Sequence, residues 1–247
     1  MTEIIRVEQL DIGYEGEVVL ENLNFSIDRG EITVILGRSG CGKTTVLKSL
    51  IGLLPPLAGS IYFSGERLEY SRESSLQALY GRIGVLYQGS ALLNSLTVYQ
   101  NVALPVTMQY PQLPKEIEID MVNARLFQVG LLESRDKYPA ELSGGMKKRA
   151  GLARAMILDP EVIFGDEPSA GLDPITAVGL DELMLNLKEL FGITFVVVTH
   201  ELRSIDKIAD KAIVLKDGSL HYAGPYRDLL SLDDNFMQTF FLKGEKK

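Results

Sequence analysis

The eight residues Gly37-Arg38-Ser39-Gly40-Cys41-Gly42-Lys43-Thr44 combine three glycines with a terminal Lys-Thr pair. Glycines let a backbone curl so that successive N–H groups point inward, and such a loop binds phosphate oxygens. A helix that begins directly after the loop adds its positive end to that attraction. In this pattern the lysine reaches the β- and γ-phosphates of a nucleotide, and the threonine hydroxyl ligates Mg²⁺. The stretch therefore predicts a nucleoside triphosphate site that uses Lys43 and Thr44.

The residues on either side supply the elements that must position this loop. Residues 32–36 are apolar and β-branched, which is typical of a buried strand. Residues 45–51 have the pattern of a helix. A glycine-rich turn without a ligand is the alternative, but the strand, the helix and the Lys-Thr pair together favour the phosphate site.

A second group of polar residues follows another apolar run. Residues 162–164 lead through Gly165 to Asp166 and Glu167. Ligands of open parallel sheets bind at the carboxyl ends of the strands, so both carboxylates should lie beside the glycine-rich loop. Asp166 is then placed to hold Mg²⁺ through water, and Glu167 to polarise an attacking water. A strand that merely ends in an acidic turn is the alternative.

The composition excludes several classes of protein. Of 247 residues, 46% are hydrophobic and 23% charged, which is ordinary for a soluble globular protein. No apolar run approaches the roughly 18 residues that cross a bilayer, and the start lacks signal-peptide order, so we expect a cytoplasmic location. A single cysteine excludes an internal disulfide.

The net charge of −8 argues against nucleic acid as the main partner, because a phosphate backbone calls for a basic face. The cluster Lys147-Lys148-Arg149 is too short to change this. We expect these three residues to form a solvated helix face.

The sequence pattern predicts one α/β domain over residues 1–247. Buried parallel strands at 162–164 and 194–198 require a crossover, and residues 174–191 have the periodicity of that helix. Residues 212–215 and 220–223, joined through Asp217-Gly218, predict a hairpin. The expected parts are an antiparallel β lobe (1–30), a P-loop core (31–95 and 159–232), an inserted helical lobe (96–158) and a C-terminal tail (233–247).

A third motif, Leu142-Ser143-Gly144-Gly145-Met146, precedes a predicted helix over residues 147–158. Ser143 can cap that helix, whose open N–H groups form an anion site. With the glycine-rich loop and the Asp-Glu pair in this order and spacing, the chain resembles the ATPase subunit of ABC transporters over essentially its whole length. The resemblance implies an α/β fold: a P-loop NTPase core with an antiparallel β subdomain and an inserted α-helical subdomain, the ABC ATPase fold.

The resemblance also implies ATP and Mg²⁺ as cofactors and a role for each matching residue. Gln88 resembles the glutamine that touches Mg²⁺, and His200 the histidine that contacts the γ-phosphate, so both join Lys43 and Glu167 as catalytic residues. Thr44, Gln88 and Asp166 are the implied metal ligands. The implied ATP contacts are Tyr14 (stacking on adenine), Gly37, Arg38, Ser39, Gly40, Cys41, Gly42, Lys43, Thr44 and Thr45.

Dimerisation is a further implication of the resemblance. Two copies, or one copy and a similar subunit, would meet head to tail, and Ser143, Gly144 and Gly145 of one chain would close on the γ-phosphate held by the other. Asp173 resembles the loop that crosses this interface. Neither half alone neutralises the triphosphate, so ATP would join the two chains and hydrolysis would release them.

One departure narrows the subfamily: Met146 stands where the family signature usually continues with glutamine. Residues 89–98, 142–149 and 166–176 closely resemble the ATPases of Mla/MCE-type phospholipid transporters. That likeness implies phospholipid transport between membranes, a polytopic membrane permease and an MCE-domain lipid-binding protein as partners, and attachment to the cytoplasmic face of the inner membrane through the permease.

Other functions remain open at this point. The chain could serve a transporter for solute import or lipoprotein release, because the permease and not the ATPase selects the cargo. It could also be a soluble ABC ATPase for assembly of the iron–sulfur type, or a nucleotide-switched interaction module. In the tail, we expect Phe236 and Phe240 to pack one helical turn apart on the chain's own core, with docking on another subunit as the alternative.

Overall fold

The computed structural model describes residues 3–232 of the chain. The hypothesis on Phe236 and Phe240 therefore lies outside the described residues. The strands are β1 (Glu3–Tyr14), β2 (Glu17–Asp28), β3 (Ile32–Leu36), β4 (Ala58–Phe63), β5 (Glu66–Arg67), β6 (Ile83–Leu86), β7 (Val162–Asp166), β8 (Thr194–Val198), β9 (Lys211–Lys216) and β10 (Ser219–Pro225). The helices are α1 (Lys43–Leu50), α2 (Glu73–Tyr80), α3 (Val98–Gln109), α4 (Lys115–Gln128), α5 (Gly144–Met156), α6 (Pro174–Phe191), α7 (Leu202–Ile208) and α8 (Tyr226–Leu230), with 3-10 turns η1 (Leu132–Ser134) and η2 (Pro139–Glu141).

The β lobe is an antiparallel sheet with the order β2-β1-β4-β5. Its first hairpin turns at Glu15 and Gly16, which have φ of 52° and 85°, and two positive φ angles match the twist of paired strands. β4 pairs with the other edge of β1, with Val7 opposite Ile61. Strands β4 and β5 therefore belong to this sheet and not to the P-loop core, where the sequence pattern places residues 58–67. They do so because β1 offers them a free edge.

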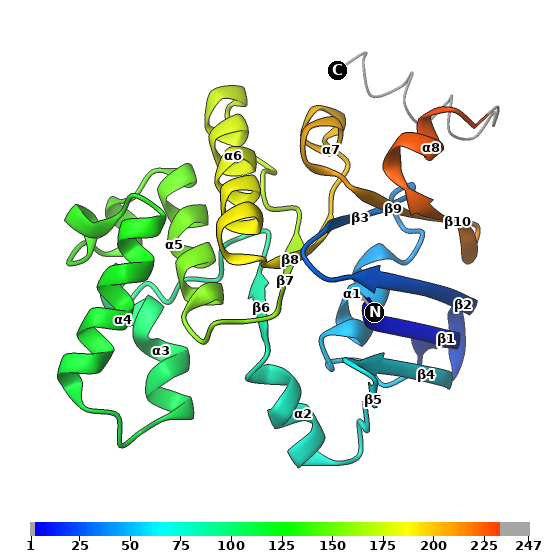
Figure 1. The fold of residues 1–247 in the computed structure, drawn as a ribbon, viewed down its shortest axis with the longest axis horizontal. Coiled ribbons are helices and arrows are strands. Elements are labelled where there is room, and N and C mark those ends of the chain that lie inside the picture. Colours follow the sequence, from blue (N-terminus) through cyan, green and yellow to red (C-terminus); the bar gives the residue numbers. More distant parts are fainter. Residues whose placement is uncertain (1–2, 233–247) are drawn as a thin grey trace.

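The core sheet, within residues 3–232, has the order β10-β9-β3-β8-β7-β6. All residues of β3 and β8 are buried, as expected for parallel strands covered on both faces. The predicted crossover is confirmed as α6, and the predicted hairpin as β9–β10. The sheet runs through the middle of the molecule, between the β lobe and the helical lobe (Figure 1).

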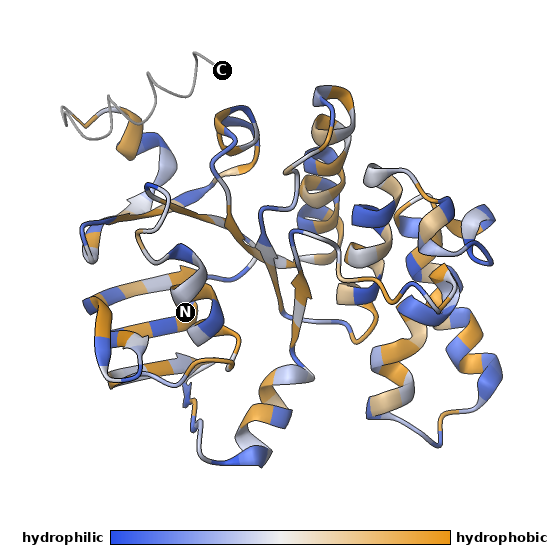
Figure 2. Ribbon diagram, turned by 180° about the vertical axis from the view of Figure 1, so that it is seen from behind, coloured by the Kyte–Doolittle hydropathy of each residue, from blue (hydrophilic) through white to orange (hydrophobic). Residues whose placement is uncertain are grey.

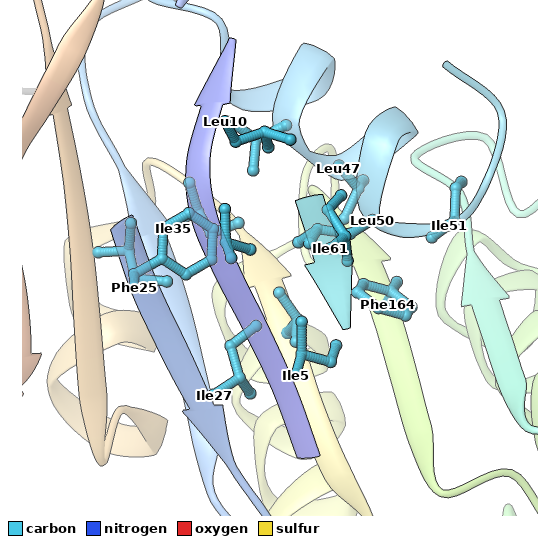
Figure 3. Close-up of a cluster of buried hydrophobic side chains, with 14 of the residues drawn as sticks. Ile5, Leu10, Phe25, Ile27, Ile35, Leu47, Leu50, Ile51, Ile61 and Phe164 are labelled. Carbon is cyan, nitrogen blue, oxygen red and sulfur yellow. The ribbon is translucent and has the colours of Figure 1, made fainter. Parts of the chain in front are cut away.

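Helix α1 fills the space between the two sheets. Its Leu47 and Leu50 meet Ile5 of β1 and Phe164 of β7 in one buried cluster (Figure 3). Each such side chain contributes about 1.5–3 kcal/mol when fully buried. Because α1 begins at the end of the glycine-rich loop (residues 37–44), this cluster anchors the loop from behind.

The other face of the core sheet is covered by α5 and α6 together with α7 and α8, whose buried apolar residues form one cluster with the sheet. The ribbons of the helices mix hydrophobic and hydrophilic residues, as expected for helices with one buried side (Figure 2). The helical lobe itself packs α3, α4 and α5 around its own buried cluster, which includes Val102, Leu126 and Ala153. α5 starts at Gly144, three residues before the predicted start, because Ser143 caps it: the Ser143 Oγ accepts a hydrogen bond from the Met146 N–H at 3.3 Å.

Candidate functional site

The register of the core sheet brings the ends of three strands together. Ile35 of β3 lies opposite Val198 of β8, and Val198 lies opposite Asp166 of β7. The residues that follow these strands therefore emerge at one edge: the glycine-rich loop, His200 and Glu167. The structure thus brings together the groups that the sequence predicts to act on the nucleotide phosphates.

The glycine-rich loop has a backbone that side chains would disrupt. Gly40 and Gly42 have φ of 80° and 96°, in the left-handed region. A Cβ on Gly37 would lie 2.4 Å from the Cys41 Sγ and 2.6 Å from the Leu215 carbonyl oxygen. Gly42 is the N-cap of α1, so the open N–H groups of that helix lie directly behind the loop.

Lys43 folds back over this loop. Its Nζ donates to the carbonyl oxygens of Gly37 and Arg38, at 2.8 and 2.9 Å. Two backbone carbonyls thus hold the ammonium at the loop, within reach of any anion that enters. A phosphate, which carries full negative charge, is a stronger acceptor than either carbonyl.

Glu167 has an unusual backbone and a side chain that is 13% exposed. Its φ is 50°, which for a residue with a Cβ costs on the order of 1–3 kcal/mol and persists only where surrounding contacts hold it. The carboxylate Oε1 lies 2.7 Å from the His200 Nδ1, whereas Oε2 is buried without a hydrogen-bond partner. An unpartnered buried oxygen is an acceptor ready for a donor such as water.

Asp166, beside Glu167, is the predicted Mg²⁺ ligand. Burial, followed by the negative charge of Glu167, raises the pKa of Asp166, and the ammonium groups of Lys48, Lys148 and Lys43 oppose that rise. The aspartate therefore lies within the electrostatic reach of the loop lysine. A bound cation would relieve the remaining repulsion between the two carboxylates.

The predicted ligands fit magnesium in kind. The Thr44 side chain is exposed at the start of α1, and Gln88 is exposed in the loop after β6. Hydroxyl, amide and carboxylate oxygens are the hard donors that Mg²⁺ takes, usually together with water and phosphate. No cluster of three His, Cys, Asp or Glu side chains suited to a metal occurs in residues 3–232. Magnesium bound there would polarise phosphate oxygens.

Tyr14 closes the hairpin of the β lobe near α1. Its side chain is 44% exposed, and the Lys48 Nζ lies 5.7 Å from the ring centroid. The β lobe therefore presents an open aromatic face beside the helix that follows the glycine-rich loop. This position suits the predicted stacking on a nucleobase.

The signature residues gather at a different place, where α5 begins against α6. A Cβ on Gly145 would lie 2.3 Å from the Thr176 Cγ2, so only glycine permits this approach. Asp173 caps α6 by accepting from the Thr176 N–H and hydroxyl, at 3.1 and 2.5 Å. The structure brings Ser143, Gly145 and Asp173 together where α5 and α6 begin.

Lys148 corrects one expectation. The sequence predicts a solvated helix face for Lys147-Lys148-Arg149, and this prediction is wrong for Lys148, which is only 5% exposed. Its ammonium donates to the backbone carbonyls of Gln88 and Glu167. The helical period could have shown this, because Gly145, Lys148 and Leu152 share the buried side of α5.

Comparison with known proteins identifies the family. The family model described as "ABC transporter" matches residues 20–170. The intermembrane phospholipid transport system ATP-binding protein MlaF of Haemophilus influenzae is 37% identical over 242 residues, covering 98% of this chain and 91% of that protein. The probable ribonucleotide transport ATP-binding protein mkl of Mycobacterium bovis is also 37% identical, over 96% of this chain, which spans only 66% of that relative's length.

A solved structure agrees with these relatives. An ATP-binding cassette in a dimeric, post-hydrolysis state with bound ADP and Pi superposes with a TM-score of 0.81 and 28% identity, covering 90% of this chain and 98% of that one. The three motifs, the fold and the family match lead to one conclusion: the chain belongs to the ABC transporter ATP-binding family and is an ATPase that takes ATP with Mg²⁺.

Proposed function

We propose that this ATPase powers phospholipid transport between membranes, through ATP-driven closure of two copies in head-to-tail contact. The observation that supports phospholipid as the cargo is the alignment with MlaF, which covers 98% of this chain and 91% of that protein. The exposed position of Ser143 supports the proposed closure of the dimer. The first N–H groups of the helix that it caps can bind a phosphate held by the other copy.

Glu167 is the base in the proposed reaction. Its carboxylate, whose Oε2 has no hydrogen-bond partner in the structure, accepts a hydrogen bond from the attacking water, which it orients and polarises. With Glu167 ionised, the His200 Nδ1 carries the proton of their 2.7 Å hydrogen bond, which steadies the carboxylate. The exposed side of the His200 ring then faces the γ-phosphate.

Lys43 and Ser143 supply the electrostatic part. Lys43 exchanges its two carbonyl acceptors for the β- and γ-phosphates when ATP enters. Ser143 and the first N–H groups of α5, from the second copy, complete the set of donors around the γ-phosphate. Hydrolysis and phosphate release remove the shared anion, so the two copies separate.

The proposed permease docks in a groove beside the loop that contains Gln88. This groove, of about 360 Å³, has a mainly apolar lining that includes Tyr87, Leu104 and Met108. Tyr87 and Met108 are 40% and 76% exposed. The proposed place at the cytoplasmic face of the inner membrane is reached through this contact with the permease. None of the helices in residues 3–232 is long and apolar enough to span a bilayer.

Affinity purification tests the cargo. The tagged chain is purified from gently solubilised native membranes, and co-purifying proteins and lipids are identified by mass spectrometry. A polytopic permease together with an MCE-domain protein and enriched phospholipid is the expected result. Soluble partners alone would exclude transport and favour an assembly ATPase of the iron–sulfur type.

Solute import is the second candidate function. It is favoured by the mkl relative, which is 37% identical and described as a probable ribonucleotide transport protein. A permease that co-purifies with a solute-binding protein and no MCE-domain protein would select this candidate. A permease with a lipoprotein bound would select lipoprotein release.

A further inference from the structure

Lys148 connects three parts of the chain. It lies on the buried side of α5, and its ammonium donates to the carbonyl oxygens of Gln88 and of Glu167, the latter at 3.2 Å. Gln88 belongs to the loop after β6, and Glu167 to the turn after β7. One cation from the helical lobe therefore holds the backbone of both segments that flank the proposed water site.

The surroundings of Lys148 suit a charged group. Burial lowers the pKa of Lys148, and the negative charges of Glu167 and Asp166 act in the opposite direction. A buried ammonium is stable only when it is hydrogen-bonded and near opposite charge, and here both conditions are met. Its two carbonyl acceptors would in turn be left short of a donor if it were removed.

The backbone of Glu167 depends on such contacts. Its left-handed conformation is held by a hydrogen bond from its own N–H to the Val198 carbonyl, at 2.8 Å. Its carbonyl accepts from the Ala170 N–H at 3.2 Å and also from Lys148. Strained backbone persists where several contacts hold it in place. Of the three contacts to the Glu167 backbone, only the one from Lys148 is made by a side chain.

We propose that Lys148 is a positioning residue for ATP hydrolysis, which holds the backbone of Glu167 and Gln88 so that the Glu167 carboxylate stays aimed at the attacking water. The inference rests on the proposed role of Glu167 as the base. Lys148 acts through backbone carbonyls and not on the substrate. It also links the helical lobe to that carboxylate, so a movement of α5 changes the geometry of hydrolysis.

A second cation of α5 keeps the test specific. Arg154 donates to the carbonyl oxygens of Ser90 and Ala91, at 2.8 and 2.7 Å. These residues follow Gln88 in the same loop, so the loop stays attached to α5 when Lys148 is replaced. The effect of a Lys148 variant is therefore confined to Gln88 and the Glu167 turn.

The experiment measures steady-state ATP hydrolysis of the full chain for Lys148→Met, Lys148→Arg and the control Lys147→Met. Lys147 is the neighbouring lysine and is half-buried. Lys148→Met should lower kcat about tenfold and leave the KM for ATP within about twofold, because positioning acts on the chemical step and not on ATP binding. Lys148→Arg should restore kcat to within about threefold, since its guanidinium can donate to both carbonyls. Lys147→Met should match the parent.

The outcomes separate clearly. A wild-type kcat for Lys148→Met would overturn the inference. It would also be overturned if KM rose as much as kcat fell and Lys148→Arg did not restore kcat, because that result indicates a general structural role. Thermal unfolding is measured in parallel. If Lys148→Met does not fold, the shorter polar variant Lys148→Gln replaces it. Its kcat should then be lower than that of Lys148→Arg and higher than that of Glu167→Gln. Glu167→Gln tests the proposed role of Glu167 as the base. If Glu167→Gln is active, the proposed mechanism of hydrolysis is wrong. If Glu167→Gln is inactive and Lys148→Met is fully active, only the positioning role of Lys148 is wrong.

Discussion

Two edges of this molecule bear the residues that the sequence assigns to ATP, and they are built differently. At the core edge, Glu167 is held by backbone contacts on either side and by His200. At the signature edge, Ser143 is exposed and its Oγ accepts from the N–H of its own helix. The first edge is constrained before any ligand enters, and the second consists of a capped helix end that faces outward.

This difference suggests a division of labour. The core edge contains a loop that can bind a triphosphate by itself, together with the base for its hydrolysis. The signature edge contributes the Ser143 hydroxyl and the first N–H groups of α5. We therefore expect variants of the core edge to change ATP binding or chemistry in a single chain, and variants of the signature edge to change hydrolysis only when two chains meet.

The largest expected effect is that of Glu167→Gln. Loss of the base should lower kcat by about 10²–10⁴-fold, with ATP binding retained and a closed dimer accumulating in size-exclusion chromatography with ATP. Glu189→Gln, an exposed substitution on α6, is the matched control. A Glu167→Gln protein that hydrolyses ATP at the parent rate would remove Glu167 from its role.

Lys43→Ala should follow. Loss of the ammonium removes charge-assisted hydrogen bonds worth about 2 kcal/mol, so the Kd for ATP should rise roughly 30-fold in isothermal titration calorimetry. Lys137→Ala, an exposed lysine of the helical lobe, should bind ATP like the parent. Unchanged affinity in Lys43→Ala would contradict the proposed use of the loop.

Ser143→Asp tests the signature edge directly. Aspartate caps a helix as well as serine does, so the melting temperature should hold, but its charge would face the γ-phosphate of the other chain. We expect about a tenfold loss of hydrolysis with the ATP affinity of the single chain unchanged. Thr97→Asp likewise replaces a capping hydroxyl by a carboxylate, at the start of α3, and should not affect the rate. Normal hydrolysis by Ser143→Asp would count against a phosphate contact across the dimer.

Tyr14→Ala should have the smallest effect. The ring is only half-enclosed, so loss of one stacking contact should raise the Kd for ATP about fivefold, or by ~1 kcal/mol. Tyr14→Phe keeps the ring and should bind like the parent. Equal affinity of the alanine and phenylalanine variants would mean that the adenine lies elsewhere.

Much of the fold could be predicted from the sequence, because its strongest signals are local. The apolar runs before Gly37 and Asp166 mark buried parallel strands, and the period of residues 174–191 marks the crossover helix. These predictions are confirmed. The β lobe was predicted only in part, because the pairing of β4 with β1 depends on a free edge some fifty residues away, which no local pattern records.

The candidate site shows the same limit. Its residue types and spacing were evident from the motifs, and the sheet register places them at one edge. The left-handed backbone of Glu167 could not be predicted, since that conformation is rare for glutamate and exists here through contacts from β8 and α5. The burial of Lys148 runs against the general preference of lysine for the surface, and in the sequence only its position on the helical period of α5 indicates it.

The order of strands in the core sheet has a consequence for synthesis on the ribosome. β3, which leads into the glycine-rich loop, pairs with β8 and β9, whereas β1 pairs with its direct neighbour β2. A chain that emerges from its amino end can form the first hairpin early, but β3 lacks its first partner until residue 198 has left the exit tunnel and its second until residue 216 has done so. Nascent chains should therefore acquire the loop geometry late, so that an ATP site is assembled only when the helical lobe and both carboxylates have already been made.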